Sequence, residues 1–184
     1  MTEEKALSLR PLWVFGYASL MWNPGFPVVE TRQAILRGYN RSFCMSSIHH
    51  RGTEEEPGLV LALDPSPESE CTGLALRVPD ADAAGAVTYL RERELISSAY
   101  VERLVSLDLG DAHVTALAYV VDTGHVQYVA GMPLEAQAQV IAKAVGGRGP
   151  NTEYLWNTVA QLEKLGVRDE DLSWLSDRVR ELVL

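Results

Sequence analysis

Hydrophobic residues in the first two thirds of the chain gather in short runs bounded by glycine, proline or polar clusters, a pattern typical of β-strands. The run 12–15 contains four large apolar residues and is followed by Gly16, which indicates a strand buried on both faces that ends in a turn. Residues 46–56 are predicted to form a loop, and the Asp-Pro-Ser-Pro cluster at 64–67 is predicted to form a turn. Further strands are predicted at 33–45, 59–63, 73–78, 100–109 and 113–121.

The spacing of apolar residues changes to three and four positions in the last third, which predicts helices there. These apolar residues extend over 134–145, 155–162 and 172–182. Asn151 or Thr152 is expected to cap the second of these helices, and Asp169 precedes the third. One more helix is predicted among the strands, from Asp80 to Leu95. The pattern therefore predicts an α+β fold with a helical C-terminal third and a β-rich body that forms a closed or nearly closed sheet.

Length and composition fit one globular domain, because the chain has 184 residues of which 47% are hydrophobic and 22% are charged. We expect this domain at 12–184, after an N-terminal extension at 1–11. The net charge of −9 comes without a stripe of basic residues, so neither nucleic acid nor a membrane surface is an expected partner. No run approaches the roughly 18 apolar residues of a spanning helix, and we expect a cytoplasmic protein. Cys44 and Cys71 are isolated and are expected to be buried thiols.

Glu94 is the acidic residue with the most informative position. At about 100° per residue it falls on the same stripe of the predicted helix as Val87 and Leu90, whereas Glu92 faces water. Apolar surroundings raise the pKa of a carboxyl group and make it suitable for proton transfer near neutral pH. The alternative interpretation is a helix-end glutamate that turns outward or pairs with a neighbouring arginine.

Other residues give weaker indications of chemistry. Ser19 follows a strand and a glycine, but the segment 16–20 lacks the G-x-S-x-G spacing of a serine-hydrolase nucleophile. His49 and His50 are adjacent, and no third ligand lies at a recognisable spacing, so no metal site is expected. The glycine-rich segment 146–150 lacks the Lys-Ser/Thr of a phosphate-binding loop and is predicted to be a helix stop and connector.

Five short motifs, in the same order along the chain, resemble those of the ChaC family of γ-glutamylcyclotransferases. Each motif is short, but together they span most of the chain from residue 12 to residue 175. The matching segments are 14–20 (V-F-G-Y-A-S-L against V-F-G-Y-G-S-L), 38–43 (G-Y-N-R-S-F against G-Y-x-R-x-F), 50–52 (H-R-G), 89–94 (Y-L-R-E-R-E, whose final R-E carries the catalytic glutamate) and 149–155 (G-P-N-T-E-Y-L against G-x-N-x-E-Y-L).

The resemblance implies a single-domain mixed β-barrel with surrounding helices and a reaction that needs no cofactor and no metal. In that reaction the α-amine of a γ-glutamyl group, usually that of glutathione, attacks its own γ-carbonyl and releases 5-oxoproline. The implied catalytic residue is Glu94, which would take a proton from the attacking amine and return it to the leaving amine. The substrate-binding residues that the resemblance implies are Val14, Phe15, Gly16, Tyr17, Ala18, Ser19, Leu20, Arg41 and Tyr154.

Two departures from the family pattern bear on the site. Ala18 stands where the family has its second loop glycine, and a positive φ there would cost on the order of 1 kcal/mol. Residues 95–100 lack the more usual glycine-containing turn, which leaves the role of Tyr100 open, as the role of His50 is. Glutathione is the expected small-molecule substrate. The alternatives are a broader γ-glutamyl peptide or amine cyclotransferase, a non-catalytic barrel that binds a small ligand, and a Ser19-based acyl hydrolase.

Overall fold

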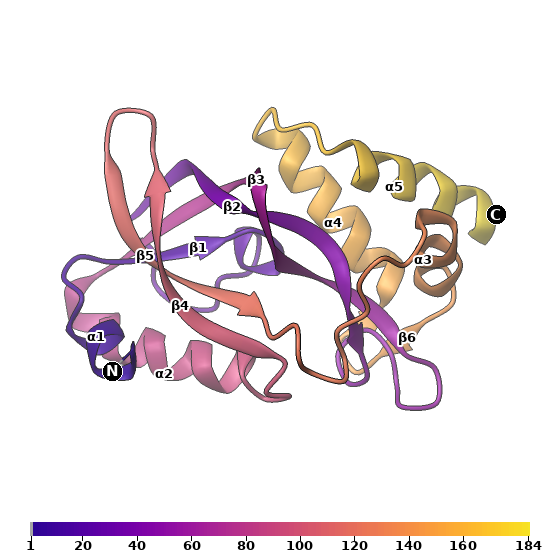
Figure 1. Ribbon diagram of the computed structural model, residues 1–184, viewed down its shortest axis with the longest axis horizontal. Coiled ribbons are helices and arrows are strands. Elements are labelled where there is room, and N and C mark those ends of the chain that lie inside the picture. The colour runs from indigo at the N-terminus through magenta and orange to yellow at the C-terminus, as the bar shows by residue number, and fades with distance from the viewer. Residues whose placement is uncertain (1) are drawn as a thin grey trace. The chain divides into compact units, whose positions relative to one another are not determined.

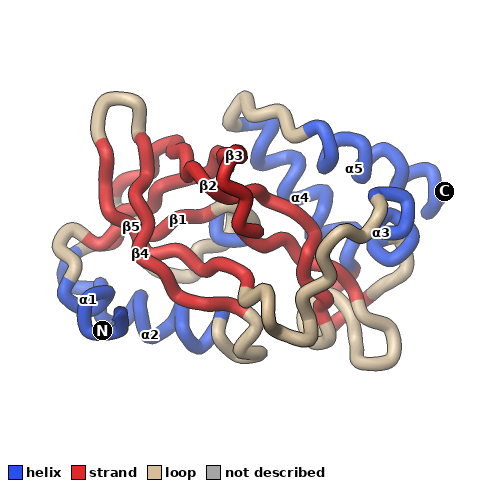
Figure 2. The backbone as a smooth tube through the Cα atoms, in the orientation of Figure 1, coloured by secondary structure: helices blue, strands red, loops and turns tan. Residues whose placement is uncertain are grey.

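The computed structural model describes residues 2–184, which divide into two compact units. Unit 1 contains the chain up to residue 41 and residues 63–125, and unit 2 contains residues 42–62 and 126–184. Five strands close into a barrel in the order β1-β3-β2-β4-β5 (Figure 2), which confirms the predicted α+β class and closed sheet. The strands are β1 (Leu12–Gly16), β2 (Glu30–Ser47), β3 (Gly58–Val78), β4 (Tyr100–Asp108) and β5 (His113–Val121).

The first strand is buried along its whole length, as its run of large apolar residues predicts. Trp13 pairs with Arg77 of the antiparallel neighbour β3 and with Ala116 of the parallel neighbour β5. The predicted strands β4 and β5 pair as an antiparallel hairpin, with Gly110 in the turn at a φ of 89°. Strand β1 therefore has a hydrogen-bonded neighbour on each side, which fixes the direction in which the chain leaves Gly16.

The prediction of a turn at 64–67 was wrong, because β3 is one continuous strand through both predicted strands and the cluster between them. Proline lacks the N–H that a central strand must donate, so it is accepted only where a strand edge is unpaired. Pro65 and Pro67 are exposed, and the register with β1 involves only Leu74–Val78. The two prolines therefore lie on a part of β3 where the missing donors do not interrupt that register.

Two helices of unit 1 pack against each other, α1 (Thr2–Ser8) and α2 (Ala83–Glu94), and α1 also contacts β4 (Figure 1). The sequence analysis did not predict α1. The helix expected from Asp80 begins as a 3-10 turn, η2 (Asp80–Asp82), and ends one residue earlier than predicted. Its buried side chains include Ala86, Val87, Leu90 and Arg93. The predicted boundary between an extension at 1–11 and a domain at 12–184 stays a prediction.

Unit 2 contains three helices, α3 (Leu134–Ile141), α4 (Asn151–Lys164) and α5 (Glu170–Val183), with α3 and α4 both packed against α5 (Figure 1). Asp169 caps α5 as predicted, since its carboxylate accepts from the N–H of Leu172 at 3.1 Å. Helix α3 ends earlier than predicted, and β6 (Val145–Gly146) pairs with β7 (Gly149–Pro150) in a two-stranded ladder. Within the described residues, the helices are too short or too polar to cross a lipid bilayer.

The prediction that Asn151 or Thr152 caps α4 was wrong. Pro150 occupies the cap position, and no side chain accepts a hydrogen bond there. Asn151 is fully buried inside the first turn, where its side-chain oxygen accepts from the N–H of Leu59 and its amide donates to the carbonyl of Leu59, both at 2.7 Å. The side chain therefore pairs with the backbone of β3 as a neighbouring strand would.

Candidate active site

The loop after β1 is held in place by its own tight geometry and by a buried tyrosine. A short 3-10 helix, η1 (Ser19–Met21), follows β1 directly, and a Cβ at Gly16 would lie 3.3 Å from the Cβ of Leu20. The hydroxyl of Tyr17 donates to the carbonyl of Tyr119 on β5 at 2.9 Å in a buried hydrogen bond. The backbone from Tyr17 to Leu20 is therefore anchored to the barrel at its start and cannot swing as a free surface loop.

Arg41 contacts the backbone of the same loop. Its side chain is buried, and its guanidinium donates to the carbonyl of Tyr17 at 2.7 Å and to the carbonyl of Thr72 on β3 at 2.6 Å. Charge-assisted hydrogen bonds of this length are among the stronger polar contacts in proteins. The predicted site residue Arg41 thus lies against the predicted loop, where it fixes the backbone of Tyr17.

The other predicted residues of segment 14–20 are buried or half-buried. Val14 and Phe15 have fully buried side chains within β1, and their assignment to substrate binding stays a prediction. Ala18 has a φ of −143°, outside the left-handed region, so the replacement of the family's glycine meets no penalty of that kind. Ser19 is half-buried, while Leu20 packs inward.

Glu94 is the last residue of α2, and its side chain is 18% exposed. Glu92 is exposed, so the two glutamates face the surroundings that helical periodicity predicts for them. The carboxylate of Glu94 forms an ion pair with the guanidinium of Arg93, with 3.1 Å between Nε and Oε1, so the structure shows the alternative of pairing with a neighbouring arginine and not purely apolar surroundings. An adjacent positive charge favours the ionised carboxylate, which is the form that accepts a proton.

Arg93 connects Glu94 with the loop after β1. Its side chain is only 5% exposed. One terminal nitrogen donates to the hydroxyl of Ser19 at 2.9 Å, and the other donates to the carbonyl of Asn23 at 2.7 Å. The structure therefore brings together the predicted base, Glu94, and the predicted binding loop, although residues 19 and 94 are 75 positions apart in the chain.

Sequence analysis missed Arg93, although a signal was present. Arg93 follows Ala86 by seven positions and Leu90 by three, so it continues the buried stripe of α2. A charged residue at such a position is rarely buried without a partner. The stripe that singled out Glu94 therefore also contained Arg93.

A second acidic residue, Glu102 on β4, was also missed. Its buried carboxylate accepts from Arg91 on α2 through both oxygens, each at 2.8 Å, and from the hydroxyl of Tyr119 at 3.1 Å. Burial, followed by the negative charges of Glu102 and Glu94, raises the pKa of Tyr119 above its ordinary value. Both oxygens of Glu102 are thus engaged by donors. A glutamate inside a strand of branched residues is the signal that could have found it.

Tyr154 lies in unit 2, on α4. Its hydroxyl accepts from the N–H of Leu61 at 3.2 Å, and its ring packs edge-on against Phe43 with the centroids 6.1 Å apart. The guanidinium of Arg51 lies over the same ring, 5.6 Å from its centroid, and donates to the carbonyl of Pro150 at 3.1 Å. Burial lowers the pKa of Arg51 from its ordinary value. These contacts give Tyr154 a packing role within unit 2, and its assignment to substrate binding stays a prediction.

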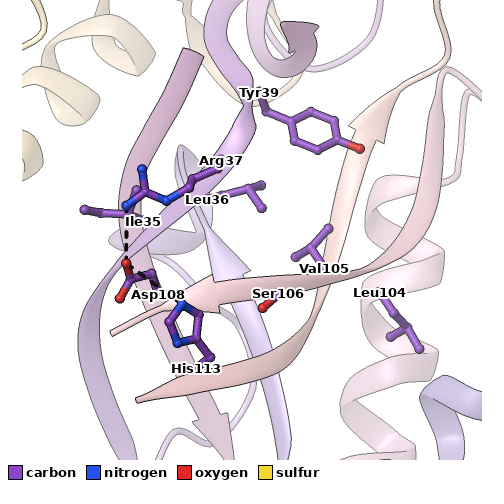
Figure 3. A pocket seen from close by; sticks show the side chains of 9 residues that line it. All are labelled: Ile35, Leu36, Arg37, Tyr39, Leu104, Val105, Ser106, Asp108 and His113. Carbon is purple, nitrogen blue, oxygen red and sulfur yellow. Dashed lines mark hydrogen bonds and ion pairs between the residues drawn. The ribbon is translucent and has the colours of Figure 1, made fainter. Parts of the chain in front are cut away.

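A groove of about 440 Å³ in unit 1 lies between Ile35–Tyr39 of β2 and Leu104–Asp108 of β4, with His113 of β5 at one end (Figure 3). Its acidic group, Asp108, accepts from Arg37 at 3.4 Å. The N–H of Gly110, and then Arg37, hold the pKa of Asp108 below its ordinary value, which makes this carboxylate a weak base. The groove contains none of the predicted site residues.

Two residues whose roles were left open take ordinary structural positions. Tyr100 is the first residue of β4, is half-buried, and pairs with Val121 of β5. His50 is half-buried in unit 2 beside the β6–β7 ladder, where its carbonyl accepts from the N–H of Arg148 at 2.9 Å. Among the residues with described positions, no three His, Cys, Asp or Glu side chains gather in a way that could hold a metal ion.

Comparison with known proteins identifies the family. A family model described as ChaC-like protein matches residues 12–182. The chain belongs to this ChaC-like family. The glutathione-specific gamma-glutamylcyclotransferase of Escherichia coli is 36% identical over 174 residues, which cover 94% of this chain and 74% of that protein. The human glutathione-specific gamma-glutamylcyclotransferase 1 is 34% identical over 175 residues, which cover 92% of this chain and 79% of that protein.

A solved structure carries the same fold. The crystal structure of a gamma-glutamyl cyclotransferase specific to glutathione from yeast matches with a TM-score of 0.84 and 24% identity, over 95% of this chain and 100% of that one. The predicted resemblance to the ChaC family and the predicted mixed barrel are therefore confirmed. Of the ChaC motifs, segments 14–20, 89–94 and most of 38–43 lie in unit 1, whereas 50–52 and 149–155 lie in unit 2.

Proposed function

We propose that this ChaC-like protein is a γ-glutamylcyclotransferase that converts glutathione into 5-oxoproline and Cys-Gly. The single observation that carries the proposal is the junction at which Glu94, on the last turn of α2, is tied through Arg93 to the loop after β1. Relatives that match this chain over more than nine tenths of its length are named for the same reaction on glutathione. A cytoplasmic location stays a prediction.

The reaction needs few catalytic groups from the protein, because the nucleophile and the electrophile belong to one substrate. A bond forms between the α-nitrogen of the glutamyl group and its γ-carbonyl carbon, and the bond from that carbon to the cysteine nitrogen breaks. No water is consumed and no electrons are transferred. Holding the flexible glutamyl chain in a ring-closing conformation supplies much of the rate enhancement.

Two proton transfers remain, and Glu94 is suited to both. The α-amine must lose a proton to become a nucleophile, and the cysteine nitrogen must gain one to leave as an amine. The ion pair with Arg93 keeps Glu94 in the proton-accepting form before reaction. We expect backbone N–H groups of the Tyr17–Leu20 loop to stabilise the oxyanion and to bind the α-carboxylate. The bond from Arg41 to the carbonyl of Tyr17 supports this role, because it fixes the backbone of the loop.

The contacts of Ser19 argue against the hydrolase alternative. A nucleophilic serine needs a neighbouring base that removes its proton. The partner of the Ser19 hydroxyl is Arg93, and a guanidinium has only donors and stays protonated. Ser19 therefore lacks the base at the place where a triad would hold one.

The test is the release of 5-oxoproline from glutathione by the purified protein. Glu94→Gln keeps the shape and removes the proton acceptor, so turnover should fall by at least ~10²-fold. Glu92→Gln is the matched control, since Glu92 is exposed two residues earlier on the same helix and should leave turnover unchanged. Near-normal turnover in the Glu94 variant would show that Glu94 is not the base.

Substrate specificity is tested by comparing kcat/KM for glutathione with that for γ-glutamyl-alanine. Both carry the glutamyl group, but the dipeptide lacks the terminal glycine carboxylate. Loss of one charge-assisted hydrogen bond to that carboxylate corresponds to roughly 10 to 200-fold in kcat/KM. Equal values for the two substrates would leave a cyclotransferase of broader specificity, and no release of 5-oxoproline from either would leave a ligand-binding barrel.

A further inference from the structure

Arg93 makes polar contacts both within its own helix and with the loop after β1. Its guanidinium donates to the carbonyls of Asn23 and Pro24 at 2.7 and 3.3 Å and to the hydroxyl of Tyr89 at 3.2 Å. It also donates to Ser19 at 2.9 Å and pairs with Glu94 at 3.1 Å. All three nitrogens of the fork are therefore in use, on a side chain that is 5% exposed.

The direction of these hydrogen bonds is fixed by chemistry. A guanidinium carries five N–H donors and no acceptor, so each of its partners must present a lone pair to it. The Ser19 oxygen consequently accepts from Arg93, and its own hydrogen is not used in that bond. The Oε1 atom of Glu94 is turned toward Arg93 in the same way, which limits the orientations that its carboxyl group can adopt.

We propose that Arg93 is a positioning residue that orients the Ser19 hydroxyl as a hydrogen-bond donor to the γ-glutamyl substrate and orients the Glu94 carboxylate as the proton acceptor. This inference rests on the proposed function, because it assigns roles within the same reaction. Arg93 itself does not touch the substrate. It acts through two neighbours, one on the loop after β1 and one on its own helix.

Lysine is the informative replacement at this position. Arg93→Lys keeps the positive charge but loses the planar fork, so one ammonium cannot contact Ser19, Asn23 and Glu94 together. We expect kcat to fall by about 10 to 100-fold while KM changes by less than about threefold, because misorientation affects the reaction more than the binding.

Arg91→Lys is the matched control. Arg91 lies two residues earlier on α2 and makes a two-pronged ion pair with the buried Glu102, so its replacement by lysine also keeps the charge and loses a planar, hydrogen-bonded fork. It should lower the melting temperature at least as much as Arg93→Lys does and should leave kcat within about 1.5-fold of the wild type. An equal loss of kcat in both variants would overturn the assignment, because it would be a general consequence of disturbing α2.

A double-mutant cycle with Ser19→Ala tests whether Arg93 acts through Ser19. In the wild-type background Ser19→Ala should lower kcat/KM by about tenfold, the loss of one hydrogen bond to the substrate. In the Arg93→Lys background the same change should cost less than about twofold, because the hydroxyl is no longer oriented. Independent effects that multiply would overturn the proposal.

The outcomes separate this inference from the proposed function. A wild-type protein that releases no 5-oxoproline from any γ-glutamyl substrate would overturn both. An active wild type with an Arg93→Lys variant of normal kcat would overturn the role of Arg93 alone. If Arg93→Lys does not fold, Tyr89→Phe removes one acceptor of the guanidinium and should lower kcat about threefold, and an unchanged kcat there would overturn the role.

Discussion

Replacing Asn151 by alanine should destabilise the protein strongly, because its side chain completes the hydrogen bonding of a buried strand residue. Asn151 is 0% exposed, and its two bonds of 2.7 Å satisfy both the N–H and the carbonyl of Leu59. Alanine cannot reach either group, and each buried group left without a partner costs about 1 to 3 kcal/mol. The sum is about 2 to 6 kcal/mol, a large part of the stability of an ordinary domain.

Thermal unfolding followed by circular dichroism measures this loss. For a chain of this size, 1 kcal/mol shifts the melting temperature by roughly 2 to 4 °C, so the variant should melt at least about 4 °C lower. Asn157→Ala is the control, because Asn157 lies on the same helix and is half-buried, and alanine is the better helix former. Its melting temperature should stay the same or rise slightly. A shift below 2 °C for Asn151→Ala would refute the pairing with Leu59.

Asn151→Asp tests the two hydrogen bonds individually, because it keeps the acceptor and replaces the donor. The carboxylate still accepts from the N–H of Leu59, but it faces the carbonyl of Leu59 with a second oxygen in place of a donor. Burial and this repulsion favour the protonated acid, whose pKa in the folded state is then raised above the ordinary value of about 3.9. A raised pKa means that the variant is most stable below that value and loses stability as the pH rises. A deficit relative to the wild type that does not depend on pH would contradict the assigned geometry.

Three further predictions follow from other parts of the chain. Ser98 has a φ of 55°, so Ser98→Gly should raise the melting temperature by a few degrees, and a lowered one would contradict strain at this turn. Hydrogen bonds from Arg178 and then Gln139 lower the pKa of Glu135 from 4.5 to about 2. Because this pKa is depressed, the stabilisation lost in Glu135→Gln is present above pH 4.5 and should vanish as the pH falls toward 2, whereas a constant difference in melting temperature would refute it. Activity should survive EDTA, and loss on chelation with recovery on adding zinc would disprove this.

Elements defined by local periodicity were predictable from the sequence. Strands β1, β4 and β5 and the helices α2, α4 and α5 follow from the spacing of their apolar residues, within a few positions at the ends. The continuity of β3 was not predictable, because Pro65 and Pro67 are acceptable in a strand only where a neighbour does not need their N–H groups. That condition depends on the register with another strand, which local sequence does not encode.

The candidate site was also only partly predictable from the sequence. Counting residues separated Glu94 from the exposed Glu92, and a pair with a neighbouring arginine was one expected alternative, but the contact of Arg93 with Ser19 depends on how α2 meets the loop after β1. Asn151 has the residue type of a helix cap, yet it pairs with Leu59, 92 positions away. Periodicity thus identifies which side chains face inward, and tertiary contacts decide what each of them does there.

The course of the chain between the two units has a consequence for folding during synthesis. The chain passes from one unit to the other three times, after residues 41, 62 and 125, so neither unit is a continuous stretch of sequence. When the ribosome has released residues up to 62, each unit has only its first segment, and unit 1 becomes complete only after residue 125 has emerged. Contacts between distant segments delay folding, because the intervening chain must be closed into a loop first. No single cleavage or truncation can therefore separate either unit from every segment of the other.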